Sequence, residues 1–130
     1  MSARTSGRRS RLSRSAEFER VYRQGRSTAN SQLVLYAFPN ASTERPRLGL
    51  SVSRKVGGAV ERNRVKRLLR EAFAAAEADL LPGHDLVLVA RPPVGELARR
   101  EGLGGVQDSL AELLARAGLC SAGPRAAETR

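Results

Sequence analysis

The sequence predicts one small domain of the α/β (α+β) class, a two-layer sandwich of helices on a sheet. A length of 130 residues suits a single domain with a modest hydrophobic core. Apolar residues recur at helical spacing over 61–80, alternate with small or polar residues over 47–53, and form an unbroken run over 86–90. These segments predict a long amphipathic helix, a strand with one polar face, and a central strand buried on both faces.

The elements before the long helix follow from local signals. Ser15 is a candidate N-cap for a short helix, and Gly25 is placed to end it. Residues 33–38 are rich in β-forming side chains and predict a strand. Because only a short polar loop separates this strand from the one at 47–53, the two suggest an antiparallel pair.

A last helix is predicted over 107–117, where leucines form one stripe that Gly118 ends. The order is then helix, strand, strand, helix, strand, helix, with room for a further strand in the loops. The domain is expected to span 15–118. Residues 1–14 are expected to form a disordered basic arm, and 119–130 a disordered tail.

The charge is large and uneven. The net charge is +10, and the first 75 residues hold 17 Lys and Arg against 5 Asp and Glu. So basic a domain favours a nucleic acid partner. A membrane surface is the competing anionic partner, but the basic helix lacks Trp and has few large apolar residues, so none is expected.

Cysteine usage and the absence of long apolar runs suggest a cytoplasmic protein. A single Cys, Cys120, allows no internal disulfide, which fits a reducing compartment. No apolar run reaches the length of a transmembrane helix. The Arg- and Ser-rich first 16 residues superficially resemble an organelle transit peptide, although they contain almost no large apolar side chains.

The long helix carries a concentrated set of cations. On a helical wheel its apolar residues share one arc: Val65, Leu68, Leu69, Ala72 and Phe73. The other arc holds Asn63, Arg64, Lys66, Arg67 and Arg70, with Arg62 at its boundary near the first turn, so that five cations and one Asn lie within nine residues. A solvated face normally mixes both signs of charge, whereas like charges four residues apart destabilise a helix. Because guanidinium binds phosphate through two donors, this arc predicts a polyanion partner.

The residues for catalysis by the protein itself are missing. The nearest grouping is Asp79, His84 and Asp85, around the turn after the long helix, and it reads better as a polar turn than as a catalytic or metal site. No Cys/His spacing for zinc and no phosphate loop of the Walker type is present. The sequence therefore predicts no catalytic residue and no metal ligand, but a protein that binds RNA or DNA.

The aromatic residues leave two interpretations open. Phe18 and Tyr22 on the first helix, and Tyr36 on the first predicted strand, are three of only five aromatic residues. They fit the hydrophobic core, or a platform on which unpaired bases stack.

Two blocks together, RLGLSVSRKVG at 47–57 and RNRVKRLLREAF at 62–73, resemble the bacterial ribonuclease P protein family, the second matching its RNR motif. Shorter matches are FERVY at 18–22 with Gly25, LVLY at 33–36 and VLVAR at 87–91. The resemblance covers about residues 10–117. It implies a ribosomal-protein-like fold with about four strands, the order α-β-β-β-α-β-α and a left-handed βαβ crossover.

The resemblance also implies a function and partners. The protein would join a large catalytic RNA that removes the 5′ leader of precursor tRNA, and hydrolysis would belong to that RNA with Mg²⁺ bound mainly by it. No obligate protein partner is implied. The runner-up is a stand-alone RNA-binding or ribosomal protein with no role in cleavage.

Site residues carry over by position. Phe18, Tyr22 and Tyr36 would line a cleft for the single-stranded leader, with Lys55 at its edge. The RNR residues would face RNA: Arg62, Asn63, Arg64, Lys66, Arg67 and Arg70. Further basic contacts would come from Arg11, Arg14, Arg54 and Arg91. Two departures are Ser31, where relatives often have a cation, and Leu33, where an aromatic is common.

Overall fold

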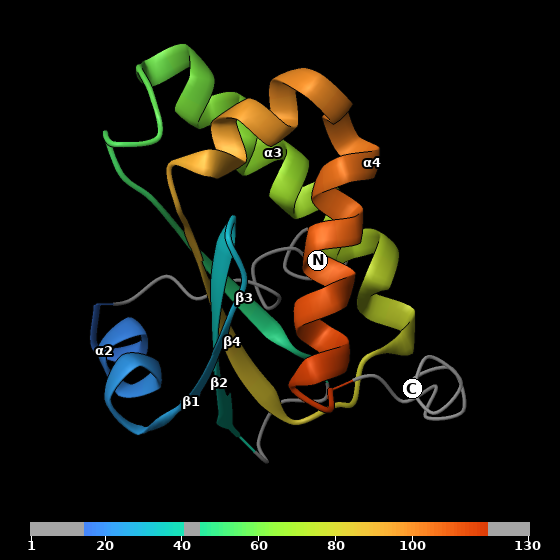
Figure 1. Ribbon diagram of the computed structural model, residues 1–130. Coiled ribbons are helices and arrows are strands. Elements are labelled where there is room, and N and C mark those ends of the chain that lie inside the picture. Colours follow the sequence, from blue (N-terminus) through green and yellow to red (C-terminus); the bar gives the residue numbers. More distant parts are fainter. Residues whose placement is uncertain (1–14, 41–44, 120–130) are drawn as a thin grey trace, which may run out of the picture.

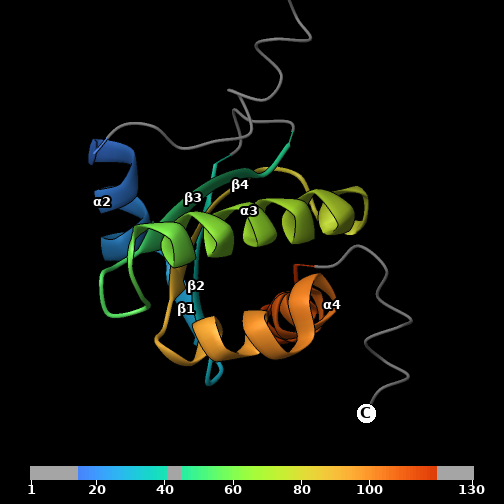
Figure 2. The same cartoon turned by 90° about the horizontal axis from the view of Figure 1, so that it is seen from above.

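The structure, a computed structural model, describes residues 15–40 and 45–119. The arm predicted at 1–14 and the tail predicted from 119, except for its first residue, lie outside the described residues. A four-stranded mixed sheet forms the centre of the molecule, with helices α3 and α4 on one face and the short helix α2 on the other (Figures 1 and 2).

The element order is the predicted α-β-β-β-α-β-α. The chain runs through α2 (Ser15–Gln24), β1 (Arg26–Ala29), β2 (Leu33–Pro39), β3 (Arg47–Val52), α3 (Ala59–Ala76), the 3₁₀ turn η1 (Glu77–Asp79), β4 (His84–Ala90) and α4 (Pro93–Arg116). Strand β1 is the further strand for which the sequence left room.

The strand pairing differs from the prediction in one respect. The strands lie in the order β1-β2-β4-β3, so the predicted antiparallel pair of β2 with β3 is wrong. Strand β4 lies between them, antiparallel to β2 and parallel to β3, with Leu88 opposite both Leu35 and Leu50. The reason is that β4 is apolar on both faces and is covered on both only at the centre of the sheet.

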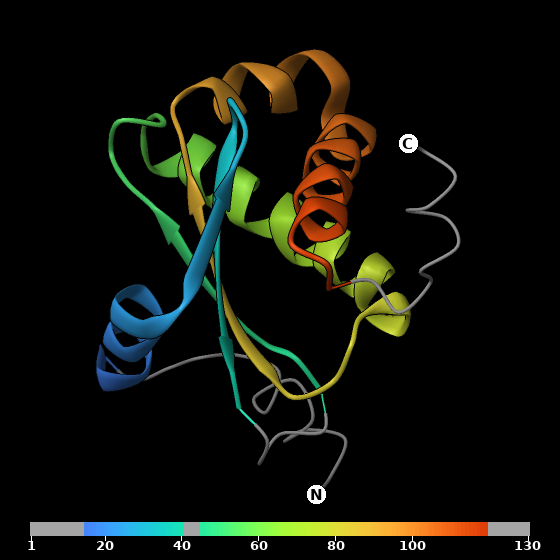
Figure 3. The ribbon, with the colours of Figure 1, turned by 60° about the horizontal axis from the view of Figure 1, so that its bottom comes forward.

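Two apolar clusters hold the layers together. The large one packs α3 and α4 against alternate residues of the sheet. Its fully buried members include Leu69 of α3, Leu33 of β2 and Leu88 of β4. The small one, on the other face, centres on Val21 of α2 and Val87 of β4, both fully buried. Figure 3 shows the resulting separation, with α2 on one side of the sheet and α3 and α4 on the other.

The long helices differ from their predicted bounds. Helix α3 begins two residues before 61, after Gly58, and passes into η1 at Glu77. Helix α4 begins at Pro93, well before the predicted residue 107, and kinks at Gly102, whose φ is 63°. Proline suits the first turn of a helix because no intrahelical partner exists there for the missing N–H. The prediction was wrong because the glycines at the kink obscured the helical pattern.

The first residue after the predicted domain end at 118 packs against the domain. Leu119 is only 5% exposed, and its carbonyl accepts a hydrogen bond of 2.8 Å from the N–H of Leu81. It therefore packs with the core. Within the described ranges, no helix is long and apolar enough to span a bilayer.

Candidate RNA-binding surface

Helix α3 divides into two faces, as the wheel predicts. The buried residues are Val65, Leu68, Leu69, Ala72 and Phe73. The outward face carries all six predicted polar residues, with Asn63, Arg64, Arg67 and Arg70 exposed and Arg62 and Lys66 half-buried. At a rise of about 1.5 Å per residue, they span roughly 12 Å of helix. Such density lets the face contact several phosphates at once.

Some of these cations also have partners within the protein. Arg62 donates through Nε to the carbonyl of Gly57 at 3.2 Å, and Arg64 donates through Nη2 to the carbonyl of Ala98 at 3.4 Å. Each bond uses one of five guanidinium donors, so most remain available. Lys66 and Arg70 form no ion pair within the described parts of the chain. Their charges are therefore not neutralised locally.

The loop over residues 53–58 brings two more cations to the start of α3. Arg54 and Lys55 are exposed there, at the end of β3. The loop is an ordered turn, because the N–H of Val56 donates to the carbonyl of Ser53 at 3.0 Å and the Val56 side chain is buried. Lys55 therefore lies between the end of β3 and the start of α3, and its place at the edge of a leader-binding cleft stays a prediction.

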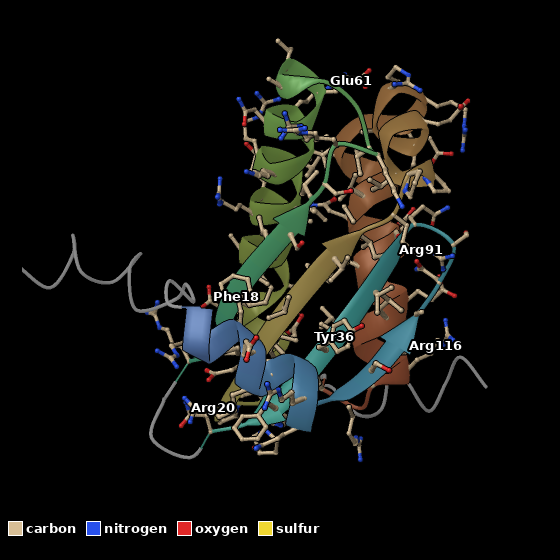
Figure 4. All side chains as sticks on the ribbon, turned by 90° about the vertical axis from the view of Figure 1, so that its left-hand side faces the viewer. Phe18, Arg20, Tyr36, Glu61, Arg91 and Arg116 are labelled. Atoms are coloured by element: carbon tan, nitrogen blue, oxygen red, sulfur yellow. The ribbon has the colours of Figure 1, made fainter. Side chains whose placement is uncertain are left out.

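The sheet face opposite α3 and α4 is only partly covered. Helix α2 crosses one end of it, leaving strands open beyond the helix (Figure 4). Phe18 and Tyr36 are half-buried against the Val21–Val87 pair. Each aromatic residue thus contributes to the small cluster and still presents a surface to solvent, so the core interpretation holds in part and base stacking stays a prediction. The backbone of Tyr22 is part of α2, but its side chain is not among those that the structure describes.

A row of small side chains forms the open part of this face. The strand registers align Ala29, Val34, Val89 and Ser51 across all four strands. They share the face of Tyr36, because Tyr36 follows Val34 by two residues in β2. None of the four was a predicted site residue. The alternation in the sequence already puts Ser51 on the polar face of its strand, but Val89 joins it only through the β3–β4 pairing.

We name this row, with Phe18 and Tyr36, the open sheet face. It meets the 53–58 loop at the end of β3, next to the first turn of α3. An aromatic and small-residue floor thus borders a cationic edge, an arrangement suited to single-stranded nucleic acid.

Arg91, predicted as a further basic contact, lies away from α3, beside the turn between β1 and β2 (Figure 4). It is exposed and donates through Nη1 to the carbonyl of Asn30 at 2.9 Å. Asn30 in turn donates through Nδ2 to Ser109 Oγ of α4 at 3.0 Å. The guanidinium is therefore fixed in place at this edge. Arg11 and Arg14 lie outside the described residues.

The buried carboxylate of Asp85 is held by hydrogen bonds from two residues of neighbouring segments. Its side chain is fully buried, and both carboxylate oxygens accept hydrogen bonds from Arg47, at 2.9 and 3.0 Å. Asn40 donates to the same carboxylate at 3.0 Å. His84 is close to the carbonyl of Pro82 through Nδ1, at 3.0 Å. Within 15–40 and 45–119, no three His, Cys, Asp or Glu residues gather as metal ligands would.

Comparisons with known proteins agree with this architecture. The family model described as "Ribonuclease P" matches residues 7–118. The ribonuclease P protein component of Shouchella clausii is 45% identical over 107 residues, which are 82% of this chain and 84% of the relative. That of Geobacillus thermodenitrificans is 42% identical over 83% of this chain and 86% of the relative.

Solved structures agree as well. The RNase P protein of Staphylococcus aureus is similar with a TM-score of 0.77 at 36% identity, covering 85% of this chain and 97% of that one. The RNase P protein of Thermotoga maritima gives a TM-score of 0.74 at 32% identity, covering 82% and 96%. The chain therefore belongs to the ribonuclease P protein family, as a protein component of this tRNA-processing ribonuclease.

Proposed function

We propose that the chain binds the catalytic RNA of ribonuclease P and the 5′ leader of precursor tRNA, and thereby assists endonucleolytic removal of the leader. The observation that carries this proposal is the meeting of two different surfaces at the 53–58 loop. One is the cationic face of α3, and the other is the open sheet face.

The α3 face suits structured RNA. Its charges are fixed on a rigid helix, and phosphate contacts of this kind position an RNA without reading its sequence. Both RNA partners offer such phosphates. The face therefore supplies affinity for the RNA subunit, with the end near Arg62 closest to the substrate.

The open sheet face suits the leader. Unpaired bases can stack on Phe18 and Tyr36, and the small residues beside them leave room for a nucleotide chain. Lys55, at the edge of this face, is placed to contact a leader phosphate. Because mature tRNA lacks the leader, this surface favours the precursor over the product.

We assign catalysis to the RNA subunit. Mg²⁺ takes about six oxygen ligands in near-ideal octahedral geometry, and no described group of side chains offers such a set. Asp85, the best buried carboxylate, is occupied by Arg47 and Asn40. RNA phosphates supply oxygen ligands, so Mg²⁺ belongs with the RNA, and no step of hydrolysis is assigned to this chain.

The test is cleavage of precursor tRNA at low Mg²⁺ concentration with the RNA subunit alone, the protein alone, and both. Fast leader removal is expected only with both. Cleavage by the protein alone would contradict the assignment of catalysis. No acceleration of the RNA subunit would instead favour the runner-up, an RNA-binding protein without a role in cleavage.

A further inference from the structure

A carboxylate lies at the start of the cationic surface. Glu61 occupies the first turn of α3, directly before Arg62 and Asn63, and its side chain is 42% exposed. A negative charge at this place would repel the phosphates that its neighbours bind. Unless a partner neutralises Glu61, the surface should therefore bind phosphates with lower affinity.

The partner comes from a different helix. Arg99 of α4 donates from Nη1 to Glu61 Oε2 at 2.6 Å. A second contact, from Arg99 Nη2 to Glu96 of its own helix, is looser at 4.0 Å. Arg99 lies after residue 75, in the part of the chain where cations do not outnumber acids. The charge pattern of the sequence therefore does not indicate a role for Arg99 in RNA binding. The Glu61 end of α3 lies beside α4 in Figure 4.

Glu61 also contacts the 53–58 loop. Its Oε1 lies against Gly57 so closely that a Cβ on Gly57 would collide with it. The next residue, Arg62, donates to the Gly57 carbonyl. On the α4 side, a Cβ on Gly95 would lie 3.1 Å from the carbonyl of Val56, a close approach. The loop, the first turn of α3 and the start of α4 thus meet around the Arg99–Glu61 pair.

We propose that Arg99 is a positioning residue for RNA binding, which neutralises Glu61 and holds it against the 53–58 loop. With this pair formed, the loop and the first turn of α3 present cations only. The inference rests on the proposed function, because it assigns a role within the same RNA-binding surface.

The neighbouring residue provides a matched control. Arg100 is 56% exposed, close to the 53% of Arg99. Its ion pairs go to Glu96 and Glu101 of α4, and among the described residues it forms no ion pair with α3. Changing Arg100 to Gln therefore alters the net charge as much as changing Arg99 does, without releasing Glu61.

The experiment measures binding of the ribonuclease P RNA at one low salt concentration, with a thermal melt of each variant. Arg99→Gln is expected to weaken binding by about 3- to 10-fold, because one uncompensated charge is left near the phosphates. Arg100→Gln is expected to stay within about twofold. The double variant, Arg99→Gln with Glu61→Gln, is expected to recover to within about twofold of the wild type, since its charge balance is restored.

Three results would overturn the inference. A double variant as weak as Arg99→Gln would mean that Arg99 contacts RNA itself. Equal losses in Arg99→Gln and Arg100→Gln would mean that only net charge matters. A lowered melting temperature in Arg99→Gln that the double variant does not recover would mean a role in folding.

Arg70→Ala separates this inference from the proposed function. If Arg70→Ala weakens RNA binding and Arg99→Gln does not, the role of Arg99 is refuted while the surface stands. If neither change weakens binding, the proposed RNA-binding face of α3 is itself refuted.

Discussion

Leu68 and Arg70 are two residues apart on α3, and their replacement by Ala should have opposite consequences. Leu68 is 5% exposed within the large apolar cluster. Truncating a leucine at such a site costs about 2–5 kcal/mol, because contacts are lost and a cavity remains. Since total stability is only about 5–15 kcal/mol, this is a large fraction of it. For a domain of this size, the melting temperature should fall by at least about 8 °C.

Arg70 is exposed, and alanine is the best helix former, so Arg70→Ala should change stability by no more than about 0.5 kcal/mol. Its effect should appear in RNA binding. The slope of log affinity against log salt concentration should fall by roughly 0.7–0.9 for the lost phosphate contact.

Thermal melts, together with RNA-binding titrations at three or more salt concentrations, measure both effects. Arg67→Ala is a useful companion, because Arg67 lies 4.0 Å from Glu71 in an exposed pair that contributes little to stability. If Leu68→Ala melted like the wild type while Arg70→Ala unfolded the domain, the assignment of the two faces of α3 would be refuted.

Three further changes test other parts of the molecule. Tyr36→Leu should reduce the affinity of the holoenzyme for precursor tRNA by about 5- to 150-fold and leave that for mature tRNA nearly unchanged, whereas equal losses would contradict a leader-binding role. Asp85→Asn should cost about 3–5 kcal/mol in a urea denaturation curve, because the half-buried Arg47 loses its carboxylate partner; wild-type stability would refute this. Gly25→Ala should lower the melting temperature, since a Cβ would lie 2.5 Å from the carbonyl oxygen of Val21; an unchanged melt would contradict the close approach.

Local patterns in the sequence were sufficient for α3 and β4. Burial of Leu68 and exposure of Arg67 follow from spacing alone, because a helix of fixed pitch converts sequence position into direction. The unbroken apolar run over 86–90 likewise indicated a strand buried on both faces, and β4 is central in the sheet. In both elements the signal lies within the segment itself.

Features that depend on distant parts of the chain were not predictable. The order of the strands is determined by which residues meet across the sheet, and no spacing within β2 or β3 reveals that β4 lies between them. The row containing Ser51 and Val89 was missed for this reason. The pairing of Arg99 with Glu61 joins residues 38 positions apart and has no signature in either helix.

The central place of β4 also affects how the chain folds during synthesis. Strands β2 and β3 have no hydrogen bonds to one another and are joined only through β4, which begins at His84. A nascent chain that has emerged only through α3 therefore carries its cationic helix but lacks the strand that completes the sheet. Pairing between strands so far apart in the chain is slow compared with helix formation. The cationic helix is thus synthesised before the open sheet face exists, and the two surfaces lie side by side only after β4 inserts between β2 and β3.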